Sequence, residues 1–160
     1  MSRKFVFIDY LANHPNLIPL LSQWNYDMWG YLDPSNTPDK NAEQLRQSAN
    51  LRQIPTCFVA IEDSQLLGSA GLIISDLSIR PELTPWLASV LVGEAYRNRG
   101  IGSALVQRVM EEAATLEVET LHLITPDKQN FYTRLGWTAI EDLDYRNELV
   151  TLMTFQPPAG

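Results

Sequence analysis

The chain has 160 residues, of which 45% are hydrophobic, and its formal net charge is −7 at pH 7. This length can bury one core without disulfides or a structural metal, and the acidic balance argues against binding nucleic acid through its phosphates. No apolar run approaches the ~20 residues of a membrane span and the N-terminus lacks a secretion signal, so we expect a cytoplasmic protein with no membrane partner.

The first half of the chain predicts strands and helices in a mixed order. Apolar periodicity and the turn residues Gly30, Pro34 and Pro38 set the expected boundaries. The expected elements are a strand at 5–11, a helix that follows residues 13–16 and runs through Trp24, a loop at 25–41, a short helix at 42–51, and a hairpin of strands at 56–62 and 66–77. Cys57, the single cysteine, falls in a strand-like run and is expected to be a small buried side chain.

The second half alternates strand and helix signals before a final hairpin. Residues 87–92 predict a strand, and apolar residues recur at helical spacing from Ile101 onward. Further on, Thr125 suits a helix cap, Pro126 the first helical position and Gly136 the stop. The expected elements are strands at 87–92, 121–124, 136–143 and 148–155, with helices from 101 and from 126. We expect one domain over residues 1–156 and a tail over 157–160.

The loop between the strand at 87–92 and the helix from Ile101 has the properties of an anion site. Gly100 and Gly102 let the backbone approach a ligand, because neither carries a Cβ. Arg97 and Arg99 add positive charge, and the helix N-terminus adds unpaired N–H groups and a favourable dipole. We expect phosphate to bind here, although a plain glycine-rich turn with solvated arginines has the same composition.

Two common phosphate loops do not fit this segment. A P-loop needs a Lys directly after its last glycine, and Ser103 follows Gly102. A dinucleotide fingerprint needs a small residue three positions after Gly102, where this chain has Leu105. The segment Arg97-Asn98-Arg99-Gly100-Ile101-Gly102 instead resembles the [QR]-x-x-G-x-[GA] signature of the GNAT superfamily of acyl-CoA-dependent N-acyltransferases.

A second motif at the right distance supports this resemblance. Residues 130–137, Asn-Phe-Tyr-Thr-Arg-Leu-Gly-Trp, are similar to the F-Y-x-[KR]-L-G-[FYW] segment that follows the fifth strand of GNAT enzymes. The resemblance covers roughly residues 66–155, while residues 1–60 share only the order of elements. It implies a three-layer α+β (α/β) fold in β-α-α-β-β-β-α-β-α-β-β order, whose mixed, mainly antiparallel sheet is flanked by helices.

The resemblance also implies acetyl-CoA as co-substrate, no metal, and roles for particular residues. Tyr132 would be the acid for the leaving thiolate, although a tyrosine on an amphipathic helix can equally be a packing residue. The fourth strand would pair with the pantetheine arm, and the loop and helix start would hold the pyrophosphate. The expected cofactor-binding residues are Val90, Leu91, Val92, Arg97, Asn98, Arg99, Gly100, Ile101, Gly102 and Ser103.

The general base is not identified by the resemblance. Many relatives carry an asparagine seven positions before the tyrosine, where this chain has Thr125, and the fifth strand offers only Glu119 at its edge. A water chain or a neutral amine would remove the need for a base. Weak candidates by location are Ser89, Asp76 and Asp27, and a structural role is more typical of His122.

The acceptor is expected to bind near two parts of the chain. Aromatic residues cluster at Trp24, Tyr26, Trp29 and Tyr31, and acidic residues cluster at Glu141, Asp142 and Asp144. An aromatic and acidic lip suits a cationic amine, although aromatic residues also dominate protein cores. The sequence therefore predicts an N-acetyltransferase for a primary amine (small molecule, peptide N-terminus or lysine), with a homodimer left open. The alternative is a catalytically weak acyl-CoA-binding sensor of the same fold.

Overall fold

The computed structural model describes residues 5–158 and contains one seven-stranded sheet. The strand order is β1-β2-β3-β4-β5-β7-β6, and every neighbouring pair is antiparallel except β4 and β5. The strands are β1 (Phe7–Tyr10), β2 (Thr56–Glu62), β3 (Gln65–Ile73), β4 (Trp86–Val92), β5 (Leu121–Thr125), β6 (Thr138–Tyr145) and β7 (Glu148–Phe155). The predicted mixed, mainly antiparallel fold is confirmed. Parts of the predicted domain and tail, residues 1–4 and 159–160, lie outside the described residues.

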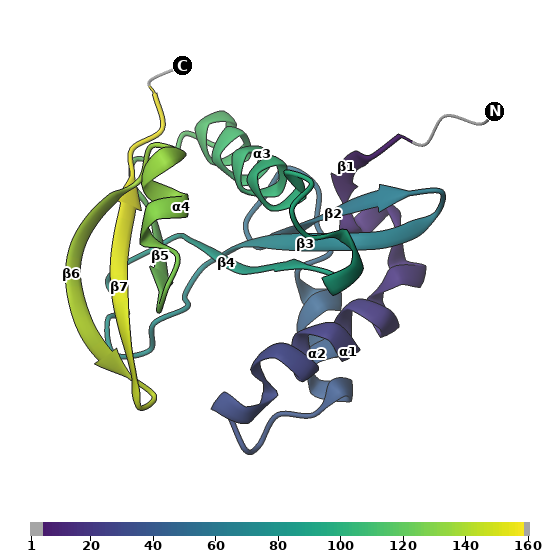
Figure 1. The fold of residues 1–160 in the computed structure, drawn as a ribbon, viewed down its shortest axis with the longest axis horizontal. Coiled ribbons are helices and arrows are strands. Elements are labelled where there is room, and N and C mark those ends of the chain that lie inside the picture. Colours follow the sequence, from purple (N-terminus) through teal and green to yellow (C-terminus); the bar gives the residue numbers. More distant parts are fainter. Residues whose placement is uncertain (1–4, 159–160) are drawn as a thin grey trace.

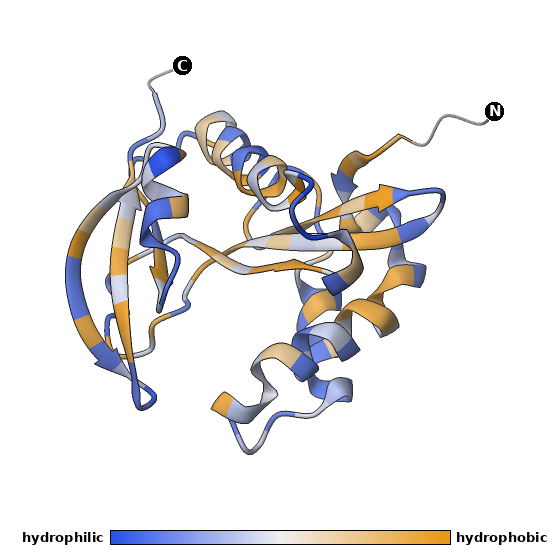
Figure 2. Cartoon of the chain, in the orientation of Figure 1, coloured by the Kyte–Doolittle hydropathy of each residue, from blue (hydrophilic) through white to orange (hydrophobic). Residues whose placement is uncertain are grey.

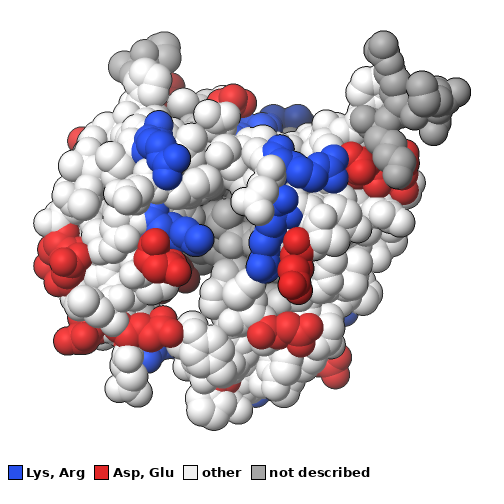
Figure 3. Space-filling view, viewed as in Figure 1, with Lys and Arg blue, Asp and Glu red and all other residues white. Residues whose placement is uncertain are grey.

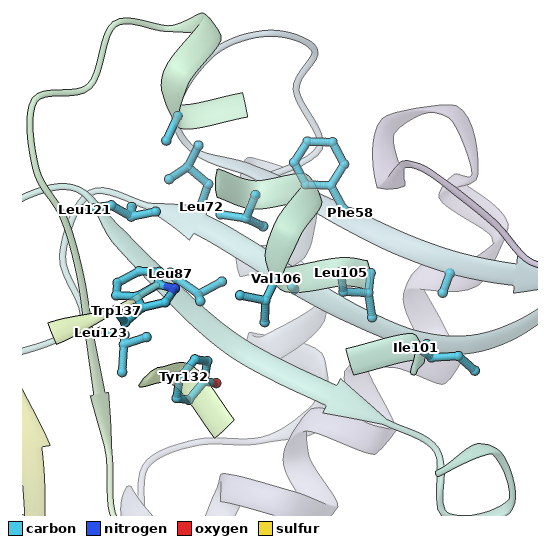
Figure 4. Close-up of a cluster of buried hydrophobic side chains, with 14 of the residues drawn as sticks. Phe58, Leu72, Leu87, Ile101, Leu105, Val106, Leu121, Leu123, Tyr132 and Trp137 are labelled. Atoms are coloured by element: carbon cyan, nitrogen blue, oxygen red, sulfur yellow. The ribbon is translucent and has the colours of Figure 1, made fainter. Parts of the chain in front are cut away.

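Four α-helices cover the two faces of the sheet (Figure 1). They are α1 (Ile18–Trp29), α2 (Pro38–Gln47), α3 (Ile101–Thr115) and α4 (Gln129–Arg134). Successive residues of β2 point to opposite faces: Phe58 packs in the core beneath α3 and α4, whereas Val59 packs with α1 and α2. The larger core, which includes Leu105, Tyr132 and Trp137, is shown in Figure 4.

Several predicted helix boundaries are wrong, for local reasons. The predicted loop at 25–41 contains the end of α1 and the start of α2, because Pro38 occupies the first helical position instead of breaking a helix. Thr37 caps that helix, and its Oγ1 accepts a hydrogen bond from the backbone N–H of Lys40 at 3.1 Å. In the second half, Thr125 ends β5 and its Oγ1 accepts from the N–H of Lys128, so α4 begins at Gln129 and not at Pro126.

The strand predictions are closer to the structure. The third strand ends at Ile73, four residues earlier than expected, because the chain then turns away from the sheet into the segment 74–85.

Cys57 is buried as predicted, and burial raises the pKa of its thiol to about 12. Figure 2 shows hydrophilic residues gathered in the loop that joins β4 to α3 and in the β6–β7 turn.

Candidate active site

The sheet opens at its centre, where β4 and β5 run parallel but pair at one position alone. Trp86 faces His122 in this register, and the N–H of His122 donates to the carbonyl of Pro85 at 3.1 Å. Beyond Trp86 the two strands diverge. The inner edge of β4 therefore presents backbone groups that no neighbouring strand uses.

A β-bulge interrupts β4 beside this opening. The register with β3 passes from Gly71↔Ala88 to Ser69↔Leu91, so β4 has one extra residue. Ser89 lies at the bulge with a positive φ of 56°, an uncommon conformation for a residue other than glycine, and its side chain is exposed. A bulge redirects the backbone, so the amides that follow Ser89, at Val90 and Leu91, are turned relative to a regular strand. The sequence did not predict the bulge, because no glycine marks it.

The N-terminus of α3 closes one end of the opening. Gly100 is in the left-handed conformation, φ 77°, and the helix has no side-chain cap. The first backbone hydrogen bond of α3 is donated by the N–H of Ala104 to the carbonyl of Gly100. The preceding N–H groups of Ile101, Gly102 and Ser103 accordingly have no protein acceptor in the described part of the chain, and are free to bind an anion.

Gly102 faces the opening. A Cβ built on it would meet Val92 Cγ2 at 3.6 Å and Phe131 Cζ at 3.8 Å, which are ordinary contact distances. The α3 N-terminus is thus flanked by the end of β4 on one side and by α4 on the other. These distances leave space for a methyl group at this position.

The predicted arginines are arranged differently from one another. Arg97 Nε donates to the carbonyl of Val92 at 3.1 Å, which keeps this side chain next to the end of β4. Arg99 instead forms an ion pair with Glu62 of β2 at 2.8 Å. Asn98 between them is in the left-handed conformation, with φ 65°. Arg99 lines a pocket of about 330 Å³ with Val6, Ile8, Gly100, Ile101 and Ala104, on the β1 side of α3.

Tyr132 lies on α4 across from β4, with 8% of its surface exposed. Its ring makes edge contacts with Phe131 and Trp137, with centroids 5.0 and 6.1 Å away. Figure 4 shows the hydroxyl oxygen on the side of the ring that points away from Leu123, and no protein group within residues 5–158 hydrogen bonds to it. Burial raises the pKa of Tyr132 to about 12, with the charge of Asp127 acting in the same direction, so the phenol stays protonated at neutral pH.

A hydrogen-bond chain fixes α4 against the last hairpin. Gln129 Nε2 donates to Thr151 Oγ1 at 2.8 Å, and this hydroxyl donates to Asp142 Oδ1 at 2.7 Å. Asp142 is therefore occupied in positioning the helix that carries Tyr132. Glu141 forms an ion pair with Arg80 at 2.7 Å. Two members of the predicted acidic lip thus have protein partners.

The remaining predicted residues occupy varied surroundings. His122 is buried, its Nδ1 lies 3.1 Å from the carbonyl oxygen of Pro85, and its ring packs on Trp86, as expected for a structural histidine. Glu119 is exposed before β5 begins, at the end of that strand where the sheet is closed. Asp27 is exposed on α1 and accepts from Gln23. Trp24 packs on Gly93 at the end of β4, and Trp29 packs in the core.

Basic and acidic side chains lie on different sides of the opening. Figure 3 shows a hollow between two lobes, with Lys and Arg above it over α4 and over the β4–α3 loop, and Asp and Glu mostly below.

The described residues include no group of three or more His, Cys, Asp or Glu that could hold a metal ion. Within 5–158, no helix is long and apolar enough to cross a membrane.

Comparison with known proteins agrees with this geometry. The profile of the Acetyltransferase (GNAT) family matches residues 18–137, which is most of the chain. The protein therefore belongs to the GNAT acetyltransferase family. Among curated proteins, none matches the sequence.

Solved structures share the fold at low identity. An aminoglycoside 6'-N-acetyltransferase from Enterococcus faecium has a TM-score of 0.72 at 20% identity and covers 95% of this chain and 97% of its own. Spermidine N-acetyltransferase from Vibrio cholerae, in complex with CoA and spermine, has a TM-score of 0.69 at 16% identity, covering 95% of each chain. A GNAT acetyltransferase from Streptococcus pneumoniae has a TM-score of 0.70 at 16% identity, covering 96% of this chain and 100% of its own.

Proposed function

We propose that the protein transfers the acetyl group of acetyl-CoA to a primary amine. The observation that carries this proposal is the opening between β4 and β5, with the free N–H groups of α3 at one end and Tyr132 beside it. The unpaired inner edge of β4 can pair with an extended amide-containing arm as a further strand would. The α3 N-terminus can hold a pyrophosphate at the same time.

The residues present fit acetyl-CoA in three respects. The backbone of Val90, Leu91 and Val92 would supply the edge for the pantetheine arm, and the amides that follow the bulge at Ser89 could donate to the acetyl oxygen. Gly102 leaves room where the phosphates would approach. Arg97 adds charge beside that position, and Asn98, Gly100, Ile101 and Ser103 contribute through the backbone. Arg99, paired with Glu62, adds charge from the other side.

The chemistry requires a neutral amine, an electrophilic carbonyl and a stabilised leaving group. The amine nitrogen attacks the acetyl carbon, the carbon–sulfur bond breaks and its electron pair leaves with sulfur, while the nitrogen loses one proton to solvent and the departing thiolate takes one up from solvent. With a pKa of about 12, Tyr132 is a weaker acid than an alkyl thiol, whose pKa is ~8.5. Tyr132 therefore stabilises the developing thiolate chiefly by donating a hydrogen bond.

An amine-panel assay tests this function. The protein is incubated with acetyl-CoA and, separately, spermidine, kanamycin, lysine and a short peptide with a free N-terminus. We expect CoA release that depends on at least one amine, with the N-acetylated product seen by mass spectrometry. Tight acetyl-CoA binding without acetylation of any amine would contradict the proposal and favour a sensor.

A further inference from the structure

The strand at one edge of the sheet, β1, has an unpaired outer side. Within residues 5–158, β1 pairs with β2 alone, and the sheet ends there. The side chains at this end of the chain are apolar and exposed, Phe5 by 67%, Val6 by 40% and Phe7 by 47% of their surface, and Figure 2 shows the segment as hydrophobic. Such an edge offers both backbone hydrogen-bonding groups and apolar surface to another strand.

A pocket borders this edge on each face of the sheet. On the α3 side, Val6 and Ile8 line the pocket of about 330 Å³ that reaches the first turn of α3. On the α1 side, Phe7 lines a pocket of about 160 Å³ together with residues that include Leu17 and Ile61. The three consecutive residues thus face the two pockets alternately, because successive side chains of a strand point to opposite faces.

A strand added to β1 would place its own side chains alternately over the two pockets. In pairing of this kind, backbone hydrogen bonds provide affinity and the alternating pockets provide specificity. The pocket walls include Ile8, Ile101 and Ala104 on one face and Leu17 and Ile61 on the other. These walls fit apolar side chains on the incoming strand.

The charged groups beside this edge are bonded within the chain. Asp9 Oδ2 lies 2.9 Å from His14 Nε2, and Asp9 Oδ1 accepts from the backbone N–H of Tyr10 at 2.8 Å. Glu62, at the end of β2, forms its ion pair with Arg99 at 2.8 Å. Because these groups already have partners, the edge is better suited to an apolar partner than to a charged one.

The opposite edge of the sheet, β6, is protected in the ways that are usual for edge strands. It carries Glu141, Asp142 and Asp144, and a bulge between Ala139 and Glu141 interrupts its pairing with β7. Residues 5–10 contain one charged side chain, the bonded Asp9, and neither proline nor lysine, and β1 pairs with β2 in an unbroken register. This difference favours a role for β1 in pairing over simple exposure.

We infer that β1 pairs with β1 of a second copy of this chain, in antiparallel orientation, so that two sheets join into one. A two-fold interface requires a surface that matches itself, and residues 5–8 supply both the exposed apolar side chains and part of each pocket wall. A two-fold axis perpendicular to the sheet keeps each face on its own side. Phe7 then lies beside Phe5 or Phe7 of the second copy, and Val6 beside Val6 or Ile8.

The size of this contact predicts a reversible dimer. The two pockets and residues 5–8 comprise about a dozen residues, roughly half of what a standard interface uses on each side. The net charge of −7 on each copy also opposes association. We therefore expect monomer and dimer to exchange at micromolar concentrations. Strands β2, β3 and β4 separate β1 from the opening, so the dimer leaves the opening accessible and the inference is independent of the proposed acetyl transfer.

Sedimentation velocity of the full chain at increasing concentration tests the inference. The mean mass of the wild type should rise from one copy towards two. Val6→Lys and Phe7→Lys each place a charge on one face of the edge, so each should raise the dissociation constant at least about tenfold. Ile140→Lys is the matched control, because it makes the same change at an exposed apolar residue of β6, and it should keep the wild-type constant within about twofold.

Melting temperatures separate loss of pairing from loss of folding. At concentrations where the wild type is monomeric, all four proteins should melt within about 4 °C of one another, because the three substituted side chains are exposed. At high concentration the wild type and Ile140→Lys should melt at higher temperatures, since dimerisation stabilises the folded chain, whereas Val6→Lys and Phe7→Lys should show no such rise.

Two results would overturn the inference. A wild type that stays monomeric at every concentration would exclude a second copy and leave the β1 edge to an apolar strand of another protein. A dimer that persists unchanged in folded Val6→Lys and Phe7→Lys would show that the copies associate through a different surface.

Discussion

Tyr132 combines two properties that a packing residue does not need together. Its ring is held by edge contacts within the core, but its hydroxyl has no hydrogen-bond partner in the described chain. The hydroxyl is not among the fully buried polar atoms that lack a partner in the described chain, so it reaches the surface and can donate to a ligand there. The thiolate of CoA would be a suitable acceptor because it gains negative charge as the bond breaks.

Tyr132→Phe removes this hydroxyl and keeps the ring contacts. We expect kcat to fall about 100-fold while the acetyl-CoA dissociation constant changes little, because the hydrogen bond strengthens as charge develops on sulfur. Steady-state kinetics and calorimetric titration measure the two quantities. Turnover near the wild-type rate would show that Tyr132 only packs.

Two substitutions of Gly102 test the anion site at the N-terminus of α3. Gly102→Glu places bulk and negative charge where the phosphates approach, so acetyl-CoA affinity should fall at least about 100-fold. Gly102→Ala is the control: its Cβ fits at ordinary contact distances, so its affinity should fall far less. Equal affinities in the two folded variants, measured by calorimetry, would remove this assignment.

At the scale of elements, α3 is tied to β1 by a buried polar cluster. Glu112 accepts hydrogen bonds from the hydroxyl of Tyr10 at 2.7 Å and from Arg108 at 3.1 Å. The guanidinium of Arg108 also lies over the ring of Phe58, 4.4 Å from its centroid. This cluster fixes the direction of the helix whose first turn forms the anion site.

Glu112→Ala should therefore destabilise the protein by about 3 kcal/mol, because it leaves Arg108 and Tyr10 without their partner. Urea unfolding measures the change. Glu43→Ala removes the exposed ion pair with Arg46 and should cost less than about 1 kcal/mol. Similar losses in both variants would mean that the buried cluster contributes no more than a surface pair.

The order of elements could be predicted from the sequence because it depends on local signals. The glycine-rich loop, the run at 87–92 and the segment around Tyr132 each carry their own pattern. The start of α2 was missed because proline marks both helix starts and helix breaks. The bulge at Ser89 and the hydrogen bond from Arg146 to the carbonyl of Leu32 depend on pairing between distant segments, which a sequence read alone does not contain.

Over the whole molecule, the net charge of −7 coexists with a basic margin at the anion site. An anionic co-substrate and a cationic acceptor would thus approach opposite sides of the hollow. The predicted acidic lip is weaker than its composition indicates, since Glu141 and Asp142 are bonded within the protein. Asp144 is the member left exposed on β6.

The dependence of kcat/KM on salt concentration tests this separation of charge. For a cationic amine, kcat/KM should fall as the Debye length shortens from ~10 Å at 0.1 M to ~3 Å at 1 M salt. Asp144→Lys should weaken that dependence with little effect on acetyl-CoA affinity. A preferred amine whose rate is indifferent to salt would show that the acidic surface does not attract the acceptor.

Direct acetyl transfer between two bound substrates is the central claim, and a single-turnover experiment with radiolabelled acetyl-CoA tests it. The thiol of Cys57 is buried and its pKa is raised to about 12, so the label should never reside on the protein. We expect label to pass to the amine only when both substrates are present. Label on the denatured protein before the amine is added, or no transfer to any amine, would contradict the account.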